Sequence, residues 1–126
     1  MAMKALIVDD CETLRRSVAR SLKSSYEVSQ AGDGIEGWQL IVAQNGDFDI
    51  VICDMQMPRC DGKDLYLLVQ AKYPELARKF VFYTAGTVHY EWLATQPQPV
   101  IAKPFTPQDM RQAFSKVGVV ETRAAM

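Results

Sequence analysis

The sequence predicts a doubly wound α/β domain, in which helices cover both faces of a five-stranded parallel sheet. Two observations predict this fold. Five short apolar runs alternate with longer segments whose apolar residues recur at helical spacing. Two of these runs, 5–8 and 50–53, are continuously apolar and rich in β-branched residues, as is typical of strands buried on both faces of a parallel sheet. Strands and helices that alternate in this way are joined by right-handed crossovers.

The five apolar runs are the predicted strands. They are residues 5–8, 26–29, 50–53, 80–83 and 100–102. The run at 26–29 is the least apolar of them, and we expect it near an edge of the sheet. The length of 126 residues fits one domain of this kind.

Four segments with apolar residues three or four positions apart are predicted helices. Their apolar positions are Leu14, Val18 and Leu22; Ile35, Trp38, Ile41 and Val42; Leu65, Leu68 and Val69; and Met110, Ala113, Phe114 and Val117. Thr106 followed by Pro107 marks the start of the last helix, because threonine caps helices and proline fits their first turn. Residues 87–96 predict one more short helix, which Pro97 ends.

Composition excludes several classes of function. The chain has 14 Lys and Arg against 15 Asp and Glu, so it lacks the surplus of positive charge expected of a protein that binds nucleic acid directly. No apolar run approaches the ~20 residues of a membrane span, and no secretory signal is visible. Cys11, Cys53 and Cys60 lack Cys-x-x-Cys spacing, and His89 is the single histidine, which argues against disulfide frameworks, zinc sites and histidine-based triads. We expect a cytoplasmic protein without membrane partners.

Polar residues follow the predicted strands where each strand ends. Asp9 and Asp10 follow the first strand, Asp54 the third, Thr84 the fourth and Lys103 the fifth. Function in such sheets collects at these ends. If the first and third strands are neighbours, three carboxylates converge and need a proton or a cation to neutralise them. Oxygen ligands without nearby His or Cys favour a hard cation such as Mg²⁺.

This set of side chains suits phosphoryl transfer. An ammonium from Lys103 and a hydroxyl from Thr84 can stabilise a phosphoryl group while one carboxylate acts as the nucleophile. Asp54 is the candidate nucleophile because it stands alone after the most apolar strand, whereas Asp9 and Asp10 form a pair suited to holding a cation.

With these residues the chain resembles the receiver domains of two-component response regulators. The matching segments are residues 6–10, 50–58, 61–62, 82–86 and 103–105. The resemblance implies a flavodoxin-like receiver domain over residues 1–120 with sheet order 2-1-3-4-5, and a tail at 121–126 that we expect to fray. It also implies a cis peptide bond between Lys103 and Pro104.

The resemblance further implies that Asp54 accepts a phosphoryl group from a histidine kinase or a histidine phosphotransfer protein. Such a chain catalyses only its own phosphorylation and dephosphorylation, and it is a monomer or weak homodimer. Phosphorylation changes its affinity for a downstream effector protein, which the sequence does not identify. The implied Mg²⁺ ligands are Asp10, Asp54 and the backbone carbonyl of Gln56, with Asp9 bound through water. Thr84 and Lys103 are implied to contact the phosphoryl group.

Two features of the sequence bear on how the chain would switch and how long it would stay phosphorylated. Many receivers have Tyr or Phe three residues before the lysine, where this chain has Val100. The aromatic switch that accompanies Thr84 is therefore absent or relocated, with Tyr83 and Tyr90 as candidate substitutes. Gln56 and Gly86 flank the route of an attacking water in the family, so we expect them to tune phosphoryl lifetime in a direction that stays open.

Other interpretations remain open at this stage. The chain could be a pseudo-receiver that binds partners without phosphorylation, or a phosphohydrolase of the haloacid dehalogenase type. The latter needs a second Asp two residues after the nucleophile, where this chain has Gln56. The loop into the fifth strand also resembles receivers attached to hybrid histidine kinases. Asp9 or Asp10 taken alone could cap a helix, and Asp61 with Gly62 predicts a turn before the next helix.

Overall fold

Five parallel strands form one sheet in the order β2-β1-β3-β4-β5. The computed structural model describes residues 3–84, 89–103 and 105–118. The strands are β1 (Met3–Val8), β2 (Tyr26–Ala31), β3 (Ile50–Asp54), β4 (Phe80–Thr84) and β5 (Val100–Ala102). The predicted fold class and strand order are confirmed, and β2 lies at an edge as expected.

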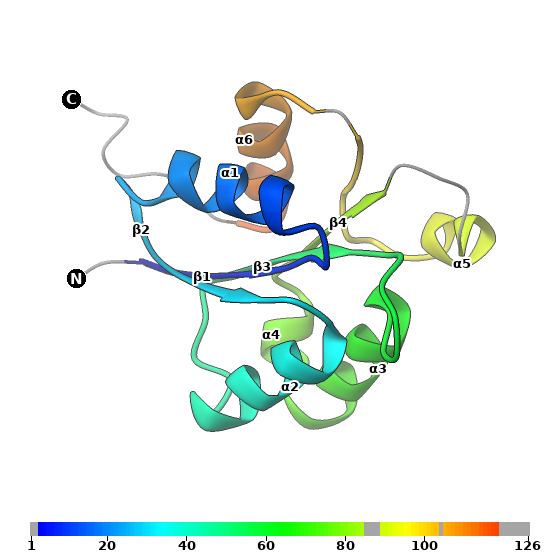
Figure 1. The fold of residues 1–126 in the computed structure, drawn as a ribbon. Coiled ribbons are helices and arrows are strands. Elements are labelled where there is room, and N and C mark those ends of the chain that lie inside the picture. The colour runs from blue at the N-terminus through cyan, green and yellow to red at the C-terminus, as the bar shows by residue number, and fades with distance from the viewer. Residues whose placement is uncertain (1–2, 85–88, 104, 119–126) are drawn as a thin grey trace.

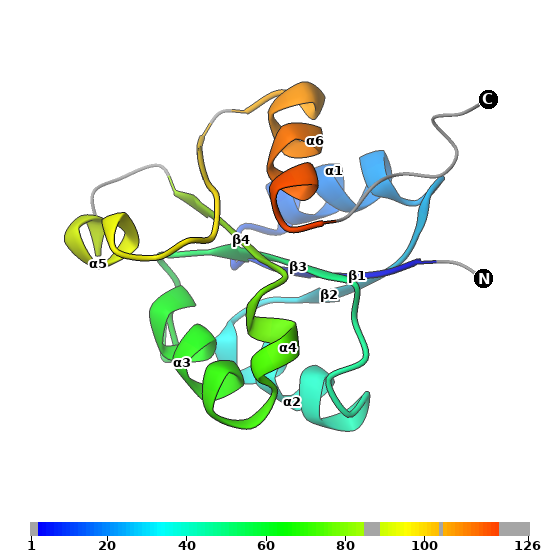
Figure 2. The same ribbon diagram turned by 180° about the vertical axis from the view of Figure 1, so that it is seen from behind.

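Helices cover both faces of the sheet (Figure 1). The helices are α1 (Glu12–Leu22), α2 (Gly34–Ala43), α3 (Gly62–Lys72), α4 (Pro74–Ala77), α5 (Tyr90–Ala94) and α6 (Pro107–Lys116). Seen from either side, α1 and α6 lie on one face, α2, α3 and α4 lie on the other, and α5 lies beside the β4–β5 side of the sheet (Figure 2). The predicted helix at 87–96 is shorter than expected, and α4 was not predicted.

Alternating side chains of the inner strands pack into two separate hydrophobic cores, one on each face of the sheet. In β1 and β3, the side chains facing α2 and α3 are Leu6, Val8, Val51 and Cys53. The side chains facing α1 and α6 are Ala5, Ile7, Ile50 and Ile52. All five residues of β3 are buried, so this strand carries its apolar pattern on both faces, as a central parallel strand must.

Side-chain caps fix where three helices begin. Asp33 accepts a hydrogen bond from the Glu36 amide at the start of α2. Asp61 accepts one from the Asp64 amide at the start of α3, so the turn predicted at 61–62 does precede a helix. Thr106 forms a reciprocal capping box at the start of α6.

None of the helices in the described part of the chain has the length and apolar character needed to span a bilayer.

Gly62 lets α3 begin directly against the end of β3. A Cβ atom at this position would lie 2.5 Å from the Asp54 carbonyl oxygen and 2.9 Å from the Met55 Cα, distances that backbone atoms do not tolerate. At Gly32 the nearest atoms are instead the flexible ends of Glu36 and Arg15, at 3.4 and 3.6 Å. A larger residue at position 62 therefore has to displace the strand end that carries Asp54.

We expect Gly62→Ala to lower the free energy of unfolding by about 1–3 kcal/mol, the usual cost of overpacking. Gly32→Ala is the matched control and is expected to change it by less than about 0.5 kcal/mol. Urea unfolding of both variants with equal m-values measures the difference. Equal stabilities of the two variants would show that α3 and β3 separate freely at this contact.

Candidate active site

The site lies at the carboxyl ends of β1, β3 and β5. Val8 in β1 pairs with Cys53 in β3, so the residues that follow, Asp9 and Asp54, lie alongside each other. One carboxylate oxygen from each of Asp9, Asp10 and Asp54 lies within 4.8 Å of the others. The structure thus brings together the three acids that the sequence placed at strand ends.

The three acids differ in exposure and in hydrogen bonding. Asp9 is fully buried, Asp54 is 3% exposed, and Asp10 is exposed. Asp9 does not cap α1, because Cys11 holds the N-cap position without a side-chain bond. Instead, Oδ1 of Asp9 accepts a hydrogen bond of 3.0 Å from the Cys11 amide, and Oδ2 accepts one of 2.5 Å from the Tyr83 hydroxyl.

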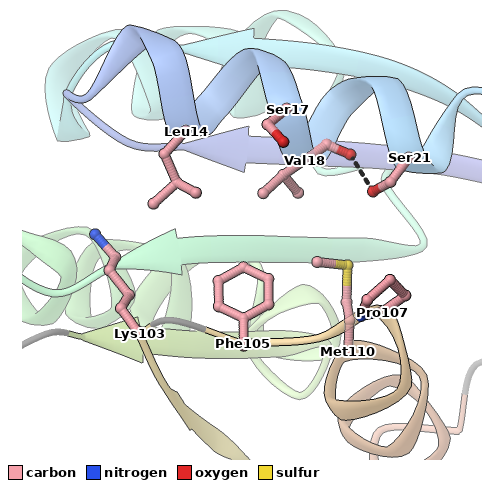
Figure 3. A pocket seen from close by; sticks show the side chains of 8 residues that line it. All are labelled: Leu14, Ser17, Val18, Ser21, Lys103, Phe105, Pro107 and Met110. Atoms are coloured by element: carbon pink, nitrogen blue, oxygen red, sulfur yellow. Dashed lines mark hydrogen bonds between the residues drawn. The ribbon is translucent and has the colours of Figure 1, made fainter.

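Lys103 is the cation of the site. Its Nζ lies 3.3 Å from Oδ2 of Asp54 and 4.0 Å from Oδ2 of Asp9, and its side chain is 18% exposed. The Lys103 amide donates to the Thr84 carbonyl at 2.9 Å, which ties the end of β5 to the end of β4. In Figure 3 the Lys103 side chain lies at one end of a pocket between α1 and α6, beside Phe105.

Strand alternation explains why these side chains meet. Ile52, Val81 and Ile101 all face α1 and α6. The residues two positions further along, Asp54, Tyr83 and Lys103, therefore point to the same face of the sheet. Asp54 also pairs directly with Tyr83 in the β3–β4 register.

Burial of Asp54 disfavours its ionised form by more than Lys103 offsets. Burial raises the pKa of Asp54 to about 6, and the nearby charge of Asp9 acts in the same direction. Lys103 and the Gln56 amide, which donates to Oδ1 of Asp54 at 3.3 Å, act against this rise. Three clustered carboxylate oxygens with surplus negative charge fit a hard divalent cation.

Several predicted residues lie at the border of the site or outside the described chain. Gln56 is exposed and contacts Asp54 through its amide. Val100 is 44% exposed and lines a cavity of about 440 Å³ with Thr84 and Tyr90. The predictions for Gly86 and for the Lys103–Pro104 peptide bond fall outside the described residues.

Sequence reasoning missed the contact that Tyr83 makes with the site. This side chain is fully buried, and burial together with the charge of Asp9 raises the pKa of its phenol far above the usual range, so the hydroxyl remains a donor. Strand alternation is the signal available, because it places Tyr83 on the same face of its strand as Val81, two positions earlier. The other candidate substitute for the missing aromatic, Tyr90, is 69% exposed.

His89 also has a contact that the sequence did not reveal. Its Nε2 lies 2.8 Å from Oδ2 of Asp61, so the start of α5 is joined to the start of α3. Asp61 therefore both caps α3 and contacts His89.

Known proteins are similar to this chain in sequence and in fold. The family described as the response regulator receiver domain matches residues 5–115. A chemotaxis protein CheY homolog from Campylobacter jejuni is 32% identical over 120 residues, covering 91% of this chain and 92% of the relative. Sensor kinase CckA from Brucella abortus is 33% identical over 78 residues, covering 61% of this chain and 8% of the kinase. A solved response regulator receiver domain protein from Clostridium thermocellum aligns with a TM-score of 0.80 at 27% identity, covering 91% and 93% of the two chains.

Asp54→Asn is expected to stabilise the metal-free protein at neutral pH by about 1–3 kcal/mol. The pKa of Asp54 is about 6 in the folded protein, against about 3.9 in an unfolded chain. The folded state therefore binds this proton more tightly, and the wild type loses stability as the pH rises from about 4 to about 6. Asparagine cannot ionise, so its advantage appears above that window and vanishes below it.

Urea unfolding across this pH range measures the effect, with exposed Asp10→Asn as the control that changes little. A stability difference that is the same at both ends of the range would contradict a raised pKa for Asp54.

Proposed function

The chain belongs to the response regulator receiver family, and on this premise we propose that it is the phosphoacceptor of a cytoplasmic two-component phosphorelay. The observation that carries the proposal is the pairing of buried Asp54 with Lys103 at 3.3 Å, beside two further carboxylates. An aspartate in this setting is a nucleophile with a cation next to the oxygen that would carry the phosphoryl group. We assign the receiver module to residues 1–120.

Asp10, Asp54 and the backbone carbonyl of Gln56 would hold Mg²⁺ in this proposal, with Asp9 bound through water. The acids fit the ion because their oxygens cluster within 4.8 Å and carry more negative charge than Lys103 balances. When bound, the ion neutralises charge on the acids and on the transferred phosphoryl oxygens. Exposed Asp10 lies on the open side of the cluster, whereas Asp9 is enclosed.

The proposed reaction moves a phosphoryl group from a phosphohistidine to Asp54. A carboxylate oxygen of Asp54 forms a bond to phosphorus as the bond between phosphorus and the donor's imidazole nitrogen breaks. Lys103 stabilises the negative phosphoryl oxygens, and the Thr84 hydroxyl donates a hydrogen bond to one of them. The later hydrolysis returns Asp54 to a free carboxylate, and residues Gln56 and Gly86 would set its rate.

The donor in this proposal is a histidine kinase or a histidine phosphotransfer protein. Two of the similar proteins are named for chemotaxis and for a sensor kinase, which supports a relay of this kind. The chain itself catalyses only its own phosphorylation and dephosphorylation. The charge balance of 14 basic against 15 acidic residues supports a protein partner rather than nucleic acid.

In this proposal, the conformational change that follows phosphorylation passes from the site to β5 and α5. The Lys103 amide is bonded to the Thr84 carbonyl, so movement of either residue reaches the other. Val100 and Thr84 line the cavity beside α5, and no aromatic side chain of β5 fills it. We propose that the downstream effector binds this face and senses the position of α5, and that the protein is a monomer or weak homodimer.

Asp10→Ala is expected to weaken Mg²⁺ binding at least 10-fold, because it removes a ligand of the ion and leaves Asp9 enclosed. Isothermal titration with MgCl₂ measures the affinity. Asp47→Ala is the control, since Asp47 is an exposed acid that pairs with Lys4 away from the site. An unchanged titration of Asp10→Ala would remove this residue from the ligand set.

Acetyl phosphate with Mg²⁺ is expected to add one phosphoryl group to the wild type and none to Asp54→Ala. Mass spectrometry of the intact protein and of its peptides locates the group. Asp64→Ala is the control, because this exposed acid lies outside the cluster. A wild type that stays unmodified would support the pseudo-receiver, and steady turnover of a small phosphate ester would support the phosphohydrolase. Phosphate on another residue would also overturn the assignment.

A further inference from the structure

We propose that Tyr83 is a positioning residue that holds Lys103 in place for the reaction at Asp54. The proposal rests on the function proposed above, since it assigns Lys103 a role in that reaction. Tyr83 contacts two charged groups of the site at once, through its hydroxyl and through its ring face.

The hydroxyl of Tyr83 occupies one oxygen of Asp9. The O–H donates to Oδ2 at 2.5 Å, and both side chains are fully buried. The other oxygen accepts the Cys11 amide at 3.0 Å. Both oxygens of this enclosed carboxylate therefore have a neutral donor, which a buried charge requires.

The ring of Tyr83 supports the lysine. The Nζ of Lys103 lies 4.7 Å from the ring centroid, within the range of a cation–π interaction. Phe105 packs against the same ring edge-on, with centroids 5.5 Å apart. Figure 3 shows Lys103 at one end of the pocket and Phe105 as the next side chain along it.

Two carboxylates compete for the lysine. Its Nζ is 3.3 Å from Oδ2 of Asp54 and 4.0 Å from Oδ2 of Asp9. The second of these oxygens is the one that the Tyr83 hydroxyl occupies. Asp9 is fully buried, so without the hydroxyl the Lys103 ammonium, 4.0 Å away, is the charged donor at hand for this oxygen.

The Tyr83 hydroxyl thus determines whether the Lys103 ammonium pairs with Asp54 or with Asp9. If it is removed, the flexible Lys103 side chain moves toward Asp9 and leaves the oxygen of Asp54 that would carry the phosphoryl group. A displacement of about 1 Å at a reacting centre can lower a rate up to 100-fold. The ammonium would also then neutralise Asp9 and oppose the binding of a divalent cation.

Tyr83→Phe tests this, because it removes the hydroxyl and keeps the ring. We expect phosphorylation by acetyl phosphate at saturating Mg²⁺ to slow about 10-fold. We expect the Kd for Mg²⁺, measured without acetyl phosphate, to rise about threefold. These sizes follow from loss of one hydrogen bond to a charged group. Tyr66→Phe is the matched control. It removes the hydroxyl of a buried tyrosine that lies away from the acids and accepts a hydrogen bond of 3.0 Å from Gln98. The phosphorylation rate and the Kd for Mg²⁺ should both stay within about twofold of wild type.

The Lys103→Ala background separates positioning from a general structural effect. Without the lysine there is no ammonium to misplace, so adding Tyr83→Phe should not weaken Mg²⁺ binding further. An equal loss of Mg²⁺ affinity in both backgrounds would overturn the proposal, because the hydroxyl would then act on Asp9 alone. Wild-type Mg²⁺ affinity in the single variant Tyr83→Phe would overturn it as well.

Two further outcomes keep the test decisive. If Tyr83→Phe does not fold, Phe105→Leu removes the ring that supports Tyr83 and should give the same two changes at smaller size, whereas no change would overturn the proposal. If the wild type accepts no phosphoryl group, the proposed function fails, and the Mg²⁺ titrations still decide whether Tyr83 positions Lys103.

Discussion

The structure depends on how negative charge is held out of water at the carboxyl ends of β1 and β3. Asp9 and Asp54 lie alongside each other with almost no exposure, and the charge of Asp9 disfavours the ionised form of Asp54. Among the residues that the structure describes, the groups that offset this cost are Lys103, two backbone amides and the Tyr83 hydroxyl. The site thus keeps more negative charge than its own chain neutralises, which makes it receptive to a cation and to a group that the cation stabilises.

The topology of the sheet creates this arrangement. The chain leaves β1 for β2 on one side and later enters β3 on the other, so the connections diverge between the strands that end at Asp9 and Asp54. Open α/β sheets bind ligands at such a switch point, because no connection covers it. Strand alternation then points Lys103 and Tyr83 to the same face as the acids, and Gly62 allows α3 to close against β3 without displacing Asp54. The same packing that builds the core therefore aligns the site.

The strands, their order and the convergence of the acids could be predicted, because apolar runs that stop at Asp9, Asp54 and Lys103 are local signals. The order also needed the family resemblance. Helix α4 could not be predicted, since four residues are too short to show a helical period. The bond between Tyr83 and Asp9 joins residues 74 positions apart and depends on the register of three strands. The sequence marks Tyr83 as a candidate switch aromatic, but nothing in its local sequence indicates that its hydroxyl bonds to Asp9.

The uneven packing of the fold indicates where a change at the site can travel. The acids follow residues 5–8 of β1 and 50–53 of β3, which are fully buried and resist displacement. By contrast, β5 has three residues, lies at the edge of the sheet and leaves Val100 exposed beside a cavity. Lys103 follows this short strand, and its ammonium lies 3.3 Å from Oδ2 of Asp54. In the proposed reaction, a new negative charge on Asp54 would act first on Lys103, so the strand with the least packing would move before the strands that hold the acids.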